Sequence, residues 1–162
     1  AAAMICGLDP DTVAEGLSHY LGAGRRMEYK GKWNEVDVYD DYAHHPTEIT
    51  VTLQGFRDMG FGRLFCIYQP HTYSPTAALW DDFVLALSTA DRDLPVDIYA
   101  ARETDTLGVS SALLAQAIGE KATYCADFED AAALLAAEAR PGDAIVVMGA
   151  GNVYRIFSYL GL

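Results

Sequence analysis

The chain has few cysteines and no long apolar run. Its 162 residues include three cysteines, which are far apart and show no C-x-x-C spacing. This usage fits a reduced, cytoplasmic compartment better than a secreted disulfide scaffold. No apolar run approaches the length of a membrane span, and no basic-then-apolar segment opens the chain. Neither a membrane partner nor a signal peptide is therefore expected.

Basic residues are also scarce. Eleven Lys and Arg stand against 23 Asp and Glu, which gives a formal net charge of −12. This balance disfavours nucleic acid or an anionic membrane as a partner. It still permits binding of a phosphorylated small molecule, because a few local cations suffice, and Arg25 and Arg26 form one basic spot. The length and the 51% hydrophobic content predict one compact domain with a full core.

Several catalytic motifs are missing. There is no G-x-S-x-G nucleophile elbow and no G-x-x-x-x-G-K-[ST] phosphate loop. If the protein uses ATP, the phosphate loop must therefore come from another part of it. Gly149-Ala150-Gly151 lacks the third glycine of a dinucleotide fingerprint, since position 154 is Tyr. The histidines match no metal-ligand spacing, so no dedicated metal site is expected.

From Asp40 onward, apolar runs typical of strands alternate with segments of helical periodicity. This alternation predicts an α/β fold: a doubly wound, mostly parallel sheet with flanking helices. The expected strands are 36–39, 64–68, 96–100, 122–125 and 144–148, and a hairpin turn is expected at 30–34. The expected helices are 9–20, 47–59, 77–88, 110–119, 127–139 and 152–160.

The most informative segment is Asp40-Asp41-Tyr42-Ala43-His44-His45-Pro46-Thr47-Glu48, between a strand and a helix. A strand-to-helix turn favours Asp and Pro whatever the protein does, so the segment alone leaves a structural role open. A second polar cluster, Gln69-Pro70-His71-Thr72-Tyr73-Ser74, follows the next strand. Because ligands bind at the carboxyl ends of parallel strands, two such clusters predict one convergent site.

Five ordered segments together resemble the C-terminal domain of the Mur ligases. They are 24–28, 40–48, 69–74, 97–103 and 149–152. The resemblance covers essentially the whole chain, and it is nearest to the branch of the family that joins L-alanine to UDP-N-acetylmuramate. It implies a three-domain, ATP-dependent ligase of peptidoglycan precursor synthesis that activates a carboxylate as an acyl phosphate.

The resemblance also implies a domain organisation. Residues 24–162 match the Rossmann-like C-terminal domain, and residues 1–23 match the terminal helix of the preceding central ATPase domain. The partners are the N-terminal and central domains of the same polypeptide, with UDP-N-acetylmuramate and L-alanine as substrates. The cofactors are ATP and Mg²⁺, and the central domain supplies the phosphate loop and the metal ligands.

Site residues follow from the resemblance by position. Arg26 and Asp41 match residues that contact the nucleotide, and a carboxylate is a suitable acceptor for ribose hydroxyls. Tyr42, His44 and His71 match residues that face the sugar nucleotide and the amino acid. The resemblance assigns no catalytic residue and no metal ligand within this chain.

Two positions depart from the family pattern. Relatives usually carry Arg where this chain has Pro75, and many carry Arg at Thr72. Arg102 is a candidate by motif to replace the missing cation. Two other readings stay open from the sequence: a related ligase that recycles a peptide onto the same sugar nucleotide, and a non-catalytic Rossmann-like binding module.

Overall fold

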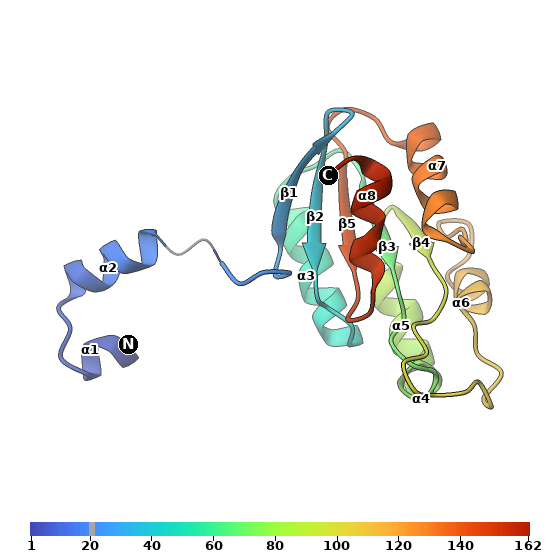
Figure 1. The fold of residues 1–162 in the computed structure, drawn as a ribbon, viewed down its shortest axis with the longest axis horizontal. Helices are drawn as coiled ribbons and strands as arrows, with labels where there is room; N and C mark the ends of the chain where they lie inside the picture. Colours follow the sequence, from blue (N-terminus) through green and yellow to red (C-terminus); the bar gives the residue numbers. More distant parts are fainter. Residues whose placement is uncertain (20–21) are drawn as a thin grey trace.

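A five-stranded sheet with the order β1-β2-β5-β3-β4 forms the centre of the protein (Figure 1). This computed structural model describes residues 1–19 and 22–162. β1 is antiparallel to β2, and the β2–β5, β5–β3 and β3–β4 pairs are all parallel. The predicted α/β, mostly parallel sheet is therefore confirmed. The strands are β1 Glu28–Trp33, β2 Val36–Asp41, β3 Leu64–Tyr68, β4 Arg92–Pro95 and β5 Ala144–Met148.

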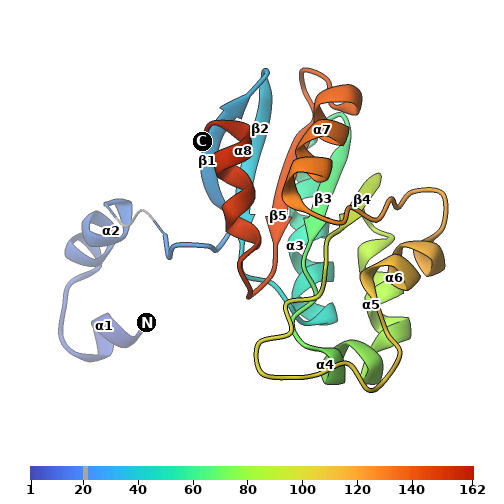
Figure 2. The same ribbon diagram turned by 45° about the vertical axis from the view of Figure 1, so that its right-hand side comes forward.

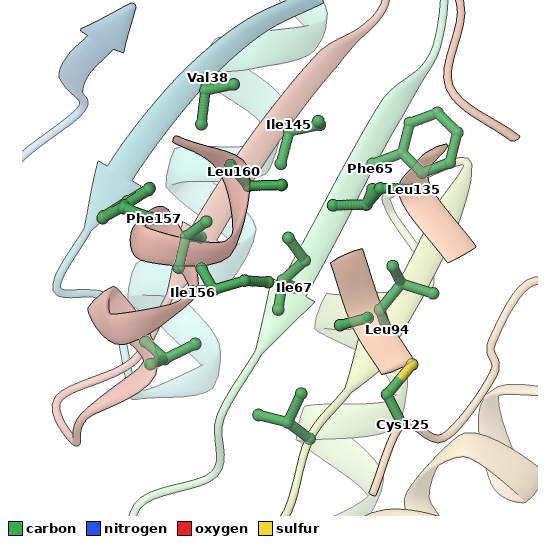
Figure 3. Packing of buried hydrophobic residues seen from close by; sticks show 14 of the residues in the cluster. Val38, Phe65, Ile67, Leu94, Cys125, Leu135, Ile145, Ile156, Phe157 and Leu160 are labelled. Atoms are coloured by element: carbon green, nitrogen blue, oxygen red, sulfur yellow. The ribbon is translucent and has the colours of Figure 1, made fainter. Parts of the chain in front are cut away.

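Helices cover both faces of the sheet (Figure 2). On one face lie α3 Pro46–Asp58, α5 Trp80–Leu87 and α6 Ser111–Ile118. On the other lie α7 Phe128–Glu138, the 3₁₀ helix η1 Val153–Ile156 and α8 Phe157–Leu160. Figure 3 shows the second layer, in which Ile156 and Leu160 pack near Ile67 and Ile145 of the sheet. Two apolar layers, one on each face, hold the sheet rigid.

The helix starts follow local capping chemistry. Ser110 and Asp127 accept hydrogen bonds from the backbone of the first turns of α6 and α7. His45 and Glu48 form a capping box at the start of α3, with Pro46 as its first residue. The helices predicted at 47–59, 110–119 and 127–139 are therefore confirmed to within a residue or two.

Three predicted boundaries are wrong. The helix expected at 77–88 is two helices, α4 Tyr73–Ala78 and α5, because Leu79 leaves the helical conformation at φ −116° and ψ 28°. The hairpin turn lies at Asn34 and Glu35, both with positive φ, so residues 30–33 belong to β1. The last helix begins as η1, at residue 153, before it becomes α8.

The fourth strand also lies earlier than predicted, at Arg92–Pro95 instead of 96–100. Arg92 is compatible with a strand because its guanidinium forms a two-point ion pair with Glu138 of α7, at 2.7 and 2.9 Å. Asp93 enters the core. The predicted segment 122–125 runs beside β4 through isolated parallel bridges, without forming a regular strand.

Two short helices, α1 Ala2–Ile5 and α2 Pro10–Ser18, precede the sheet and lie apart from it in Figures 1 and 2. Asp9 caps α2 by accepting hydrogen bonds from the amides of Asp11 and Thr12. Neither helix has a buried residue. The helix predicted at 9–20 is thus observed as α2, and its last predicted residue, Tyr20, lies outside the described residues. Among those described residues, no helix is long and apolar enough to cross a membrane.

Candidate functional site

The two polar clusters meet at the carboxyl edge of the sheet, although β5 lies between their strands. Gly149, directly after β5, allows the chain to pass close to Gln69: a Cβ there would stand 2.7 Å from the backbone oxygen of Gln69, and its φ is +143°. The rings of His44 and His71 lie 6.2 Å apart, centroid to centroid.

Four aromatic side chains form a continuous row at this edge, here called the ring row: Tyr42, His44, His71 and Tyr99. The centroids of Tyr42 and His44 are 5.4 Å apart. His71 stacks on Tyr99 at 5.6 Å with 25° between the planes. The structure therefore brings together three of the residues predicted from the sequence, and it adds Tyr99, which the sequence analysis did not select.

Two arginines lie at the Tyr42 end of the ring row. The guanidinium carbon of Arg26 is 5.6 Å from the Tyr42 centroid, and that of Arg25 is 5.1 Å away. Arg25 is bound internally, because its Nε donates to Asp40 at 3.0 Å and its Nη2 donates to the Gly149 carbonyl at 2.6 Å. Arg26 is exposed. Arg26 is thus the arginine of the pair whose charge faces solvent.

Asp41 lies beneath this loop and is only 3% exposed. Its Oδ2 accepts a hydrogen bond from the amide of Met27, and its Oδ1 accepts one from the amide of Ala43, both at 2.8 Å. Arg25 and Met27 have positive φ, of 55° and 46°. Asp41 therefore holds the 25–27 segment against the end of β2. Burial raises the pKa of its neighbour Asp40, and the charge of Arg25 opposes that rise.

The imidazole of His44 has a fixed orientation. Its Nδ1 lies 3.0 Å from the carbonyl of Tyr42 and 3.4 Å from the carboxylate of Glu48. Because both neighbours are acceptors, this arrangement places a proton on Nδ1 and leaves the Nε2 lone pair of the neutral ring available. Burial opposes ionisation of Glu48, but hydrogen bonds from the amides of His44 and His45 lower its pKa overall.

A hollow of about 370 Å³ opens at the Tyr99 end of the ring row. Polar and aromatic side chains from three parts of the fold line it: Gln69, Asp97, Tyr99, Phe128, Asn152 and Tyr159. Asp127 at the start of α7 adds a second carboxylate, and no basic residue is among the described residues that line the hollow. Its chemistry therefore suits a neutral or positively charged group better than a phosphate.

The residues that depart from the family pattern lie beside His71. Thr72 has φ 66° and ψ 156°, and Pro75 is in the first turn of α4. Arg102 precedes Glu103, whose carboxylate accepts hydrogen bonds from the amides of Tyr73 and Ser74. The segment that carries Arg102 is thus adjacent to the start of α4.

We expect Gly149→Ala to destabilise the protein by about 1–2 kcal/mol, because Ala at positive φ is strained and its Cβ meets the Gln69 oxygen. Gly142→Ala is the matched control, since Gly142 also has positive φ, +91°, with nothing within 4 Å of a Cβ. The difference in thermal stability between the two variants isolates the cost of the steric contact with Gln69. Equal losses for both variants would show that the close approach at Gly149 is unimportant.

Comparisons with known proteins point to one family. The family model for the Mur ligase, glutamate ligase domain, matches residues 25–151. The chain belongs to the Mur ligase family. It is 45% identical over 159 residues to UDP-N-acetylmuramate–L-alanine ligase of Clostridium novyi (strain NT), an alignment that covers 96% of this chain and 35% of that relative.

Solved Mur ligase structures share the fold. UDP-N-acetylmuramate-alanine ligase of Thermotoga maritima superposes with a TM-score of 0.76 at 21% identity, over 96% of this chain and 33% of that chain. A murein peptide ligase of Psychrobacter arcticus 273-4 superposes with a TM-score of 0.67 at 28% identity, over 98% of this chain and 34% of that one. The chain thus spans about a third of the length of the Mur ligases that it matches.

Proposed function

We propose that this chain is the C-terminal part of an ATP-dependent ligase that joins L-alanine to UDP-N-acetylmuramate through an acyl phosphate. The observation that carries the proposal is the convergence of Arg26, Tyr42, His44 and His71 on one edge of the sheet, in a chain 45% identical to a ligase of that name. In such a reaction the protein acts mainly by positioning the reactants and by stabilising developing charge.

The nucleotide contacts are assigned to Arg26 and Asp41. An exposed guanidinium suits a phosphate, and Arg26 is exposed. On Asp41 the amides of Met27 and Ala43 use one lone pair of each carboxylate oxygen. The remaining lone pairs accept the ribose hydroxyls when the 25–27 segment shifts, because the carboxylate is otherwise covered.

The substrate contacts are assigned to Tyr42, His44 and His71. The ring row offers an imidazole lone pair and a phenol to a sugar nucleotide. The hollow beside Tyr99, with its carboxylates, suits the amino group of an amino acid. We assign to Arg102 the cation that Pro75 and Thr72 do not provide; the attachment of its segment to the start of α4 through Glu103 supports this assignment.

The rest of the ligase supplies the remaining parts. No group of three or more His, Cys, Asp or Glu side chains is arranged to hold a metal ion within residues 1–19 and 22–162. The Mg²⁺ that accompanies ATP is therefore assigned to ligands in the central domain and on the phosphates, and residues 1–23 are assigned to the end of that domain. The lack of buried residues in α1 and α2 supports this boundary. We assign the ligase to the cytoplasm.

His71→Ala in the whole ligase tests the proposal. We expect kcat/KM for L-alanine or UDP-N-acetylmuramate to fall several-fold, because a contact in a partly solvated cleft contributes on the order of 1 kcal/mol, with the KM for ATP unchanged. His19→Ala, a change at an exposed histidine of α2's C-cap, is the control. Unchanged kinetic constants for both substrates would contradict the assignment of His71.

Two further measurements separate the proposal from its alternatives. The chain alone should hydrolyse no ATP, because the phosphate loop is absent from its sequence. The similarity to a murein peptide ligase favours a second candidate, a ligase that recycles a peptide onto the same sugar nucleotide. A whole ligase that uses a peptide beginning with L-alanine, and not L-alanine itself, would establish that second reaction.

A further inference from the structure

The loop that carries His71 follows β3, but hydrogen bonds from a segment after β4 hold it in place. The amide of Tyr99 donates to the carbonyl of Pro70 at 2.9 Å, and the amide of Thr72 donates to the carbonyl of Tyr99 at 3.0 Å. The Tyr99 ring stacks on the His71 ring between these two hydrogen bonds. The position of His71 thus depends on the segment Tyr99–Glu103, which follows β4.

Glu103 completes this attachment. Its Oε2 accepts hydrogen bonds from the amides of Tyr73 at 2.7 Å and Ser74 at 2.9 Å, the first two residues of α4. Thr72, the N-cap residue of α4, makes no capping hydrogen bond with its own side chain. Hydrogen bonds from Ser74 and Tyr73, with the nearby His71, lower the pKa of Glu103, so the carboxylate is ionised at neutral pH. A residue 30 positions away therefore caps this helix.

The cap acts on His71 through Thr72. At φ 66° and ψ 156°, Thr72 occupies a backbone region that is costly for a residue with a branched side chain. Such a conformation persists only when its surroundings hold both sides of it. On one side Glu103 fixes Tyr73, and on the other the Tyr99 segment fixes Pro70 and His71. If the Glu103 contact is lost, we expect Thr72 to relax toward negative φ and the His71 ring to move within the ring row.

We propose that Glu103 is a positioning residue, which holds the His71 ring in the ring row by capping α4 from a distance. The inference rests on the proposed function for its effect on activity and on the described contacts for its effect on geometry. An ordinary surface cap would stabilise α4 alone. Glu103 instead links α4, the strained Thr72 and the His71–Tyr99 stack in one structural unit.

The kinetic test compares Glu103→Ala, Glu103→Gln and Glu120→Ala in the whole ligase. Glu103→Ala should lower kcat/KM for the sugar nucleotide or the amino acid several-fold, and no more than His71→Ala does, because Glu103 acts on the substrate through the His71 ring. The KM for ATP should change less than about twofold, since Arg26 lies at the other end of the row. Glu103→Gln keeps an acceptor oxygen and should recover most of the activity. Glu120, an exposed residue, controls for the loss of one negative charge.

A second readout does not depend on ligase activity. In the ¹H–¹³C NMR spectrum of this chain, Glu103→Ala should shift the ring resonances of His71 and Tyr99 and leave those of His19 in place. If the whole ligase does not use L-alanine, the proposed function is wrong, but the spectral shift is still expected. An unchanged His71 signal, an equal loss of ATP use, or full activity of Glu103→Ala would overturn the positioning role of Glu103.

Discussion

Asp41→Ala is expected to lower the free energy of unfolding by about 3 kcal/mol or more. The carboxylate is 3% exposed and accepts two backbone hydrogen bonds at 2.8 Å. A hydrogen bond to a charged group contributes roughly 1.5–3 kcal/mol, and the amides of Met27 and Ala43 would both lose their acceptor. Urea unfolding of the chain measures the effect. Asp58→Ala, at the exposed end of α3, should change the stability by less than about 0.5 kcal/mol.

The same substitution should also impair ATP use in the whole ligase, by at least about tenfold in kcat/KM. Part of this loss would be indirect, because Asp41 supports the segment that carries Arg26. Asp41→Asn separates the two roles, since an amide keeps one acceptor oxygen and loses the charge. Normal stability together with normal ATP use in Asp41→Ala would contradict both roles.

Asp93→Val is expected to stabilise the protein by roughly 1–3 kcal/mol at pH 7, the usual cost of a buried polar group without a partner. Asp93 is fully buried in β4, and its carboxylate oxygens accept no hydrogen bond from a nitrogen or hydroxyl among the described residues; the donor beside them is the weakly donating thiol of Cys66. Valine fits a strand and adds no polar atom. Thermal unfolding measures the gain, and a lower melting temperature would show that Asp93 has a partner this structure does not display.

The effect of Asp93 should depend on pH in a defined direction. Burial raises the pKa of Asp93 well above its ordinary value of 3.8. Between that value and the folded-state pKa, the folded protein keeps a proton that the unfolded chain releases, so stability falls as the pH rises. Asp93→Asn removes this titration. Its advantage over the natural protein should therefore grow from pH 4 to pH 7, as measured by urea unfolding.

Local chemistry determined which elements were predictable. β3 and β5 are continuous apolar runs with polar ends, and their observed bounds, Leu64–Tyr68 and Ala144–Met148, match the prediction. β4 was misplaced because Arg92 and Asp93 are unusual in a buried strand. The first residue pairs with Glu138 of α7, and the second enters the core beside the weak donor Cys66. Neither circumstance is visible in hydrophobic periodicity.

The site residues, like the strands, were predictable only where local sequence determines them. The strand ends and the family motifs pointed to His44 and His71, and the structure places their rings 6.2 Å apart. The roles of Glu103 and Gly149 depend on contacts between residues 30 or more positions apart, from Glu103 to Tyr73 and from Gly149 to Gln69. A single sequence does not reveal such contacts. The assignments of Arg26, Asp41, Tyr42, His44 and His71 to particular ligands stay predictions.

The central position of β5 affects the order in which the sheet assembles during protein synthesis. β5 begins at Ala144, yet it lies in the middle of the sheet, between β2 and β3. During synthesis the hairpin β1–β2 and the pair β3–β4 emerge first, each with an unpaired inner edge. No backbone ladder joins them until the last strand is inserted. The sheet, and with it the meeting of the two histidine loops, is therefore completed only after residue 148 has been synthesised, and until then both inner edges are exposed to pairing with other chains.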